Sequence, residues 1–224
     1  MTPGEKATEE LAKLGQKSLD TVDRLGGWTD SVFGKGLRHL GSAFEDSMAG
    51  FRLRNRIKVI EKTRAAIDQS GLAGKTRPLD PRISMPIMDA ISDESDETLQ
   101  DVWAAYIKNA VDPKKANPDR ILIEVVRRLE PGDWPILKKT FPKAVGRMTS
   151  EDFGLSDTEL VQALDRMETL QLFDYDDPTI HYLVMGKGDE KRLMISVGDA
   201  DYYATRLLRR LAIATTDDNE EHET

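Results

Sequence analysis

The sequence contains no cysteine, which excludes disulfide bonds, thiolate catalysis and zinc–thiolate sites. It has only three histidines, His39, His181 and His222, which stand far apart and are interpreted as surface or strand residues. Neither "AGKT" (73–76) nor "GKGDEKR" (186–192) has the spacing of a phosphate-binding loop ahead of a helix. From these residues we infer no cofactor, no metal and no small-molecule substrate.

Long hydrophobic runs are also missing. No stretch approaches the ~20 apolar residues that a membrane-spanning helix needs. The first residues, "MTPGEKATEELAKLG", lack the apolar core of a signal peptide, so we expect a cytoplasmic location. The net charge of −8 makes the chain as a whole a poor ligand for nucleic acid or anionic lipid. Any such contact requires a local basic patch.

The patterns that are present are mostly helical. Apolar residues recur at three- and four-residue steps, which predicts helices, and breaks at Gly and Pro separate them. We expect helices over 4–25, within 29–70, over 95–111, over 118–129, from Pro131 to Phe141, and over 156–170. The stretch 73–86, with three prolines and no periodicity, predicts a loop, and 86–92 a short helix or turn.

The C-terminal part has a different pattern. Ser156 and Glu159 have the spacing of a capping box. Two short strands, 180–185 and 191–197, are expected around a Gly-Lys-Gly-Asp turn, followed by a final helix in "DADYYATRLLRRLAIA" with Leu207, Leu208 and Leu211 inward. Helix, helix, hairpin and helix together resemble a winged helix.

The expected fold class is therefore mainly α: a helical bundle with a small C-terminal α+β winged-helix-like unit. Along the chain this gives four segments: 1–72, an N-terminal helical arm with a basic helix; 73–142, a central helical region; 143–214, the winged-helix-like unit; and 215–224, a disordered acidic tail.

Acidic residues gather in "SDESDETLQD", residues 92–101. We interpret Ser95 as a helix N-cap, with Asp93 as a rival, and place Asp96 and Glu97 in the first turn. Carboxylates there face the positive end of the helix dipole, worth ~0.3–1 kcal/mol each. A core-facing stripe follows at helical spacing: Leu99, Val102, Trp103, Tyr106 and Ala110. This pattern indicates a helix start; a polar contact to another chain and a metal or catalytic site are the alternatives.

A basic run occupies residues 51–64, with a local charge of +5 because a single acid, Glu61, accompanies six basic residues: Arg52, Arg54, Arg56, Lys58, Lys62 and Arg64. Arg54, Lys58 and Lys62 lie four residues apart and share a helix face. Three interpretations stay open. The charges are solvated or paired within the chain, they contact a protein or another copy, or they bind phosphate backbone or anionic lipid.

Nucleic-acid binding by the C-terminal part is disfavoured by charge. The helix over 156–170 carries four acids against Arg166, a net charge of −3, so phosphates repel it. The hairpin offers Lys187, Lys191 and Arg192, but Asp189 and Glu190 lie beside them. These three basic residues are the candidate contacts in a nucleic-acid-binding alternative.

Residues 86–141, from "PIMDAISDESDETLQ" to "PGDWPILKKTF", resemble the bacterial Abi-alpha (abortive infection alpha) family. A Pro-containing approach, an acidic helix start and two further helices match its pattern at Glu94, Leu99, Trp103, Ala104, Asn109, Asp112, Asn117, Pro118, Ile121, Leu129, Pro131, Asp133, Ile136 and Leu137. The upstream "FRLRNRIKVIEKTRAAI" looks like the family's Arg-rich helix. At Tyr106–Ile107 the family more often has Leu-Leu, a difference that affects packing. The resemblance covers residues 45–141 well and the remainder loosely.

The resemblance implies a mostly helical protein with a part in bacterial anti-phage defence, and it carries over no catalytic residue. The leading hypothesis is a non-enzymatic defence protein that acts through protein–protein contact or self-association, with the 51–64 helix as its candidate surface. Two alternatives are a winged-helix nucleic-acid-binding regulator and an amphipathic effector that perturbs a membrane surface.

Overall fold

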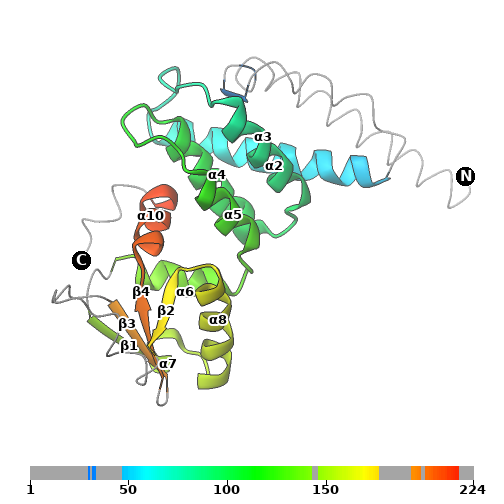
Figure 1. The fold of residues 1–224 in the computed structure, drawn as a ribbon. Helices are drawn as coiled ribbons and strands as arrows, with labels where there is room; N and C mark the ends of the chain where they lie inside the picture. Colours follow the sequence, from blue (N-terminus) through cyan, green and yellow to red (C-terminus); the bar gives the residue numbers. More distant parts are fainter. Residues whose placement is uncertain are drawn as a thin grey trace, which may run out of the picture. The chain divides into compact units, whose positions relative to one another are not determined.

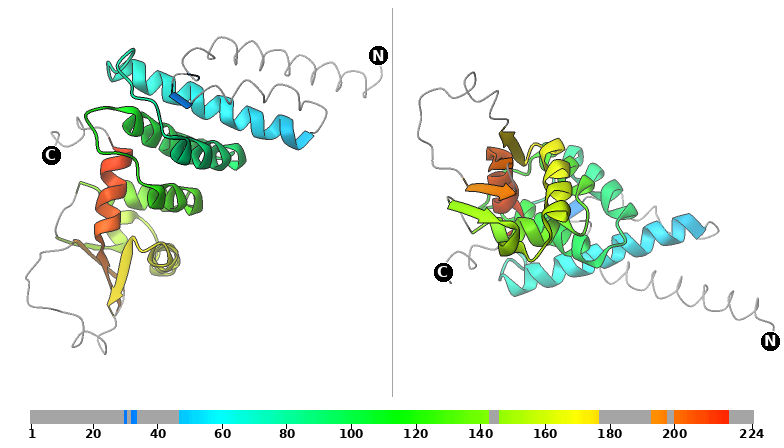
Figure 2. Two further views of the ribbon diagram at one scale, coloured as in Figure 1. Left: turned by 45° about the horizontal axis from the view of Figure 1, so that its top comes forward. Right: turned by 90° about the horizontal axis from the view of Figure 1, so that it is seen from below.

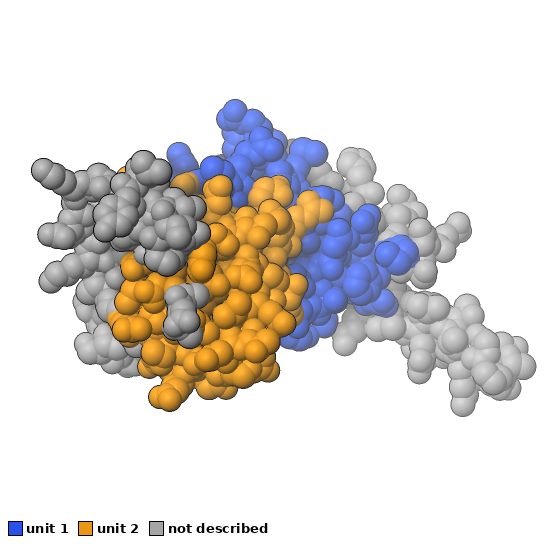
Figure 3. Space-filling view, turned by 60° about the horizontal axis from the view of Figure 1, so that its bottom comes forward, with its two compact units in different colours: residues 1–123 blue, residues 124–224 orange. Residues whose placement is uncertain are grey.

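A computed structural model describes residues 30, 32–33, 47–142, 146–176, 193–197 and 200–216 (Figure 1). The chain separates into two compact units, residues 1–123 and 124–224, which Figure 3 colours differently. The helix expected over 4–25, the strand over 180–185, the turn after it and most of the acidic tail lie outside the described residues. The division into four segments stays a prediction.

The described part of unit 1 is helical. It contains α2 (Ser47–Gln69), α3 (Pro81–Asp93) and α4 (Glu97–Val111), and α2 packs against both of the others (Figure 2). α5 (Arg120–Arg128) follows and crosses into unit 2. α2 ends close to the end of the range 29–70 in which a helix was expected, and Gly71 follows it with a φ of 70°, a left-handed conformation that glycine tolerates best.

The aromatic stripe of α4 lies in the core of unit 1, as its spacing predicts. Leu99, Val102 and Ala110 are buried, and Trp103 and Tyr106 are among the largest fully buried side chains. The Trp103 and Tyr106 rings meet edge to face, with centroids 5.9 Å apart. Burial raises the pKa of Tyr106, and its hydroxyl donates to the Asp119 carbonyl at 3.0 Å. The aromatics therefore pack the helix.

The loop expected over 73–86 is too long, because α3 already begins at Pro81. Proline suits the first helical position, where its missing N–H is not needed and its φ is preset. The Asp80 carboxylate caps the helix by accepting from the Arg82 N–H at 2.8 Å. Pro86 lies inside the helix, and burial of Ile87 and Ile91 offsets the backbone hydrogen bond that it cannot donate.

Unit 2 combines helices with a small sheet, which confirms an α+β C-terminal part. Its elements are α6 (Asp133–Thr140), β1 (Gly146–Thr149), α7 (Ser150–Phe153), α8 (Asp157–Thr169), β2 (Phe173–Asp176), β3 (Leu193–Val197), β4 (Ala200–Ala204) and α10 (Arg206–Thr215). The four-stranded sheet has the order β1-β3-β4-β2. β1 pairs with β3 in parallel, and the other pairs are antiparallel. The winged-helix likeness stays a prediction.

The final helix was expected to include residues that form a strand instead. β4 covers Ala200–Ala204, and α10 begins only after Thr205, whose hydroxyl accepts from the next N–H groups. Tyrosine favours strands, and Tyr202 is buried in the sheet. Leu208 and Leu211 are buried as predicted, whereas Leu207 is only half-buried. The strands β1 and β2 were not predicted, because four residues show too little periodicity.

α8 forms as predicted. Ser156 and Glu159 make the capping box, in which the Ser156 hydroxyl accepts from the Glu159 N–H and the Glu159 carboxylate accepts from the Ser156 N–H. The inner face of α8 is apolar, and the helix packs against β2 and β3.

Candidate interaction surface

The acidic start of α4 has a different cap from the one expected. Asp96, and neither Ser95 nor Asp93, is the N-cap, because its carboxylate accepts from the Thr98 and Leu99 N–H groups at 2.9 and 3.0 Å. Glu97 is the first helical residue. The interpretation of these acids as a helix start is confirmed, with the cap one residue later.

Three acids near the same helix start pair with the basic face of α2. Lys58 contacts Glu97 at 2.9 Å, and Lys62 contacts Asp101 at 2.6 Å and Glu97 at 3.2 Å. Arg52 contacts Asp93, at the end of α3, at 2.9 Å. Arg52–Asp93, Lys58–Glu97 and Lys62–Asp101 are separated by 41, 39 and 39 positions, so these three pairs form a ladder along α2. We call this set the α2 ion-pair ladder.

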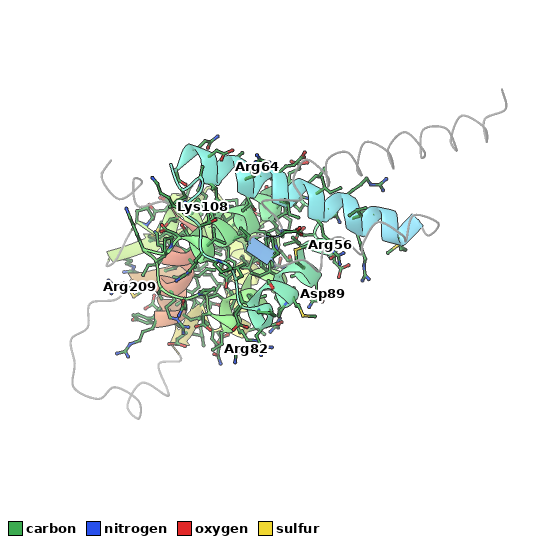
Figure 4. All side chains as sticks on the ribbon, turned by 90° about the horizontal axis from the view of Figure 1, so that it is seen from above. Arg56, Arg64, Arg82, Asp89, Lys108 and Arg209 are labelled. Carbon is green, nitrogen blue, oxygen red and sulfur yellow. The ribbon has the colours of Figure 1, made fainter. Side chains whose placement is uncertain are left out.

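A second set of contacts attaches α2 to the last turn of α3. The Arg56 guanidinium donates to the Ser92 hydroxyl at 2.5 Å and to the Met88 carbonyl at 3.2 Å. Asn55, which is buried, donates to the Ser92 carbonyl at 2.9 Å. Burial lowers the pKa of Arg56 while the nearby Asp89 opposes that change, and Figure 4 shows both residues. These contacts give Arg56 a role inside unit 1.

Arg54 and Arg64 complete the six predicted surface residues. Arg54 is exposed and Arg64 half-buried, and neither forms an ion pair within the part of the chain that the structure describes. The side chains of Arg52 and Lys58 stay 51% exposed despite their partners. An outward strip of α2 thus stays open to solvent. Lys187, Lys191 and Arg192 lie outside the described residues.

The ladder shifts the ionisation of its members in the direction of mutual attraction. Hydrogen bonds from Lys58 and then Lys62 lower the pKa of Glu97. Burial lowers the pKa of Lys62, but its hydrogen bonds to Asp101 and Glu97 outweigh that effect and raise it. Exposed pairs of this kind contribute ~0.2–1 kcal/mol each. The ladder therefore positions α2 more than it stabilises the fold.

We predict that acid and salt weaken the ladder. Because the folded pKa of Glu97 is below its ordinary value, its contribution is complete above that ordinary value and disappears as the pH falls through the lowered one. Wild type should therefore lose more stability than Glu97→Gln between neutral and acidic pH in urea unfolding at low salt. High salt should reduce the difference, and equal pH profiles at low salt would contradict this role of Glu97.

Unit 2 contains an ion pair whose carboxylate is buried. Asp133, at the first position of α6, is fully buried and accepts from the Arg166 guanidinium of α8 at 2.6 Å. Its second oxygen accepts from the Glu130 N–H at 2.9 Å. The hydrogen bond to Asp133 raises the pKa of Arg166. The only basic residue of α8 is thus engaged inside the unit, which leaves the helix surface acidic.

Sequence reasoning missed both sets of partners, although a signal for the ladder was present. Glu97 and Asp101 lie four residues apart on α4, the same step as Lys58 and Lys62 on α2. Matched steps of opposite charge on two neighbouring helices indicate pairing between them. The Asp133–Arg166 pair had no such signal, because one acid and one base give no pattern.

The described residues contain no group of three or more His, Asp or Glu side chains that could hold a metal ion. Among the same residues, no helix is long and apolar enough to span a bilayer. Several positions of the family pattern have structural roles. Four of them are buried in a core: Trp103, Ala104, Ile136 and Leu137. Asp133 accepts the hydrogen bond from Arg166.

The comparisons with known proteins identify one family. Searches of curated proteins and of solved structures gave no match. The family model described as abortive infection alpha matches residues 52–184, more than half of the chain. The chain therefore belongs to the abortive infection alpha family, and membership implies a part in abortive infection, a defence against phage.

Proposed function

We propose that this protein acts in abortive infection without catalysis, by contact with a protein partner or with further copies of itself. The observation that supports this most directly is that the acids Asp93, Glu97 and Asp101 form ion pairs with α2. Each of them that pairs with α2 serves to hold two helices together. The aromatics behind them, Trp103 and Tyr106, pack the core.

The outward strip of α2 is the surface that we propose for this contact. Arg54 is exposed, and Arg52 and Lys58 keep half of their side chains in solvent. Arginine on a rigid helix is a frequent anchor in protein interfaces, because its planar guanidinium makes several directed hydrogen bonds. The ladder fixes α2 against α3 and α4, so Arg54 and the exposed parts of Arg52 and Lys58 are presented in one orientation.

A phage challenge tests this function. We expect bacteria that express the chain to resist infection, and Arg54→Glu to reduce resistance to the level of an empty vector without changing the unfolding midpoint. The matched control is Lys138→Glu, which makes the same charge change at an exposed position of α6. It should keep full resistance. A wild-type chain that gives no protection, or a purified monomer that hydrolyses a nucleotide or nucleic acid, would refute the proposal.

The same variants separate the two alternatives. A membrane effector would sediment with anionic liposomes and lose that binding with Arg54→Glu and Lys58→Glu together. A nucleic-acid-binding regulator would bind DNA in a salt-sensitive way and lose binding when Lys187, Lys191 and Arg192 are changed. The acidic surface of α8 argues against the second alternative, because phosphates would meet four carboxylates there.

A further inference from the structure

α10 carries a basic stripe on its outer face. Arg206, Arg209, Arg210 and Ile213 lie three or four residues apart, and all four are exposed. Ile213 is 54% exposed. The opposite face of α10 is buried and holds Leu208, Leu211 and Thr215. Arg209 is marked in Figure 4. We call these four residues the α10 stripe.

A patch with the opposite chemistry lies where α8 meets β2. Tyr175 is 44% exposed, and its ring lies 5.4 Å from that of Tyr202. The Tyr202 hydroxyl donates to Asp165 at 2.8 Å, and Glu168 is close enough to help raise the pKa of Tyr202, which burial raises most. Neither acid forms an ion pair within the described residues. We call Asp165, Glu168 and Tyr175 the α8–β2 patch.

The stripe and the patch are complementary in charge and in the groups that they offer for hydrogen bonds and stacking. Arginine pairs with carboxylates in two-pronged hydrogen bonds and stacks its guanidinium on tyrosine rings. Arg209, which is exposed on the α10 stripe, thus matches a carboxylate beside an exposed ring. The one arginine of α8 is engaged by Asp133 and does not neutralise the patch.

The sheet geometry keeps the two surfaces apart within one chain. In the pairing of β2 with β4, Phe173 lies opposite Ala204, the last residue of β4. Tyr175 lies opposite Tyr202, two residues closer to the start of β4. α10 leads away from the end of β4 (Figure 1). Arg209, Arg210 and Ile213 therefore extend away from the rows of the sheet that hold Tyr175.

We propose that the α10 stripe of one copy docks on the α8–β2 patch of a second copy. This inference rests on the proposed function, for which it specifies self-association and names the interface. Because the stripe and the patch are different surfaces, the contact is heterologous. Each added copy leaves one stripe and one patch unoccupied at the ends of the assembly, unless the copies form a closed ring. Salt should weaken the contact, since exposed charges are screened over a Debye length of about 8 Å.

Charge reversal of the full-length chain tests the interface. We expect wild type to form multimers in size-exclusion chromatography with light scattering at low salt. Arg209→Glu and Glu168→Arg should each reduce the mass to that of a 25.1 kDa monomer. Both positions are exposed, so neither change should disturb folding, which far-UV circular dichroism checks. The matched controls Lys138→Glu and Glu151→Arg, also exposed, should assemble as wild type does.

Mixing gives the decisive result. Copies of one variant repel each other at this contact. A mixture of the two places Arg209 against Glu168 in one contact, and in the next the glutamate introduced at position 209 against the arginine introduced at position 168. Multimers should therefore return on mixing, and the variant that carries both changes should assemble alone. A wild type that is monomeric at every concentration, single variants that keep the wild-type mass, or a mixture that stays monomeric would each overturn the proposal.

The outcomes distinguish this interface from the proposed function. Unchanged multimers in Glu168→Arg with full phage resistance would refute the interface and leave the function standing. If bacteria that express the wild-type chain show no resistance, the proposed function is refuted, whatever the mass of the assembly. A monomeric wild type that captures another arginine-rich protein through the patch would assign the patch to that partner and refute self-docking.

Discussion

Replacing Trp103 with alanine should lower the free energy of unfolding by about 3–5 kcal/mol, because a fully buried indole leaves a cavity that the surrounding helices refill only in part. Trp103 also loses its edge-to-face contact with Tyr106. A loss of this size is a large share of the ~5–15 kcal/mol that stabilises a typical domain. Urea unfolding followed by far-UV circular dichroism measures it.

The conservative change Trp103→Phe keeps the protein measurable if the alanine variant does not fold. It preserves an aromatic ring and most of the volume, so the loss should be clearly smaller than for alanine. Ile121→Ala is the matched control, because that side chain is 55% exposed although it belongs to the same family pattern. Equal effects of Trp103→Ala and Ile121→Ala would contradict the core position of Trp103.

Replacing Asp133 with alanine should cost about 2–3 kcal/mol, because it removes two hydrogen bonds of a buried carboxylate, one of them to a charged partner. The loss should be smaller than for a fully buried ion pair, since the Arg166 side chain is 38% exposed and water can solvate it. Denaturant unfolding of unit 2 within the full chain, followed by fluorescence of the neighbouring Trp134, reports the effect.

A double-mutant cycle with Arg166→Ala assigns this loss to the pair. If the pair is the cause, the combined variant should lose less than the sum of the two single variants. Gln162→Ala is the control for Arg166→Ala, since Gln162 is exposed one turn earlier on α8 and its side chain has no contact to Asp133 among the described residues. Strict additivity of Asp133→Ala and Arg166→Ala would show that Asp133 acts only as an acceptor for the Glu130 N–H.

The helices with strong local signals could be predicted from the sequence. α8 has a complete capping box, and α4 has a continuous apolar stripe, so local energetics and burial favour the same answer. The cap of α4 was misplaced by one residue, because Ser95 and Asp96 are both good N-caps and only the geometry of the turn decides between them.

Other elements depend on contacts that no local pattern encodes. Pro81 was assigned to a loop because prolines usually interrupt helices, yet at the first helical position proline is favourable. β4 was assigned to a helix because its residues adjoin a leucine-rich stretch. Its strand is fixed by pairing with β3, which directly precedes it, and with β2, which lies farther back in the sequence.

The candidate surface was predicted as a set of residues but not in its division of roles. The spacing placed Arg54, Lys58 and Lys62 on one face, and it could not tell which of them would meet an acid. In the structure Lys62 forms an ion pair with Asp101, and Arg54 is exposed to solvent. That difference arises from the packing of α2 on α4, which depends on the whole of unit 1.

The parallel pairing of β1 with β3 has a consequence during synthesis on the ribosome. Arg147 of β1 contacts Ser196 of β3, 49 positions later. β1 leaves the exit tunnel first and must wait for β3 before it has a neighbour, so unit 2 acquires its sheet late. Ribosome-bound chains stalled before residue 193 should therefore be far more sensitive to protease in this region than chains stalled well after it.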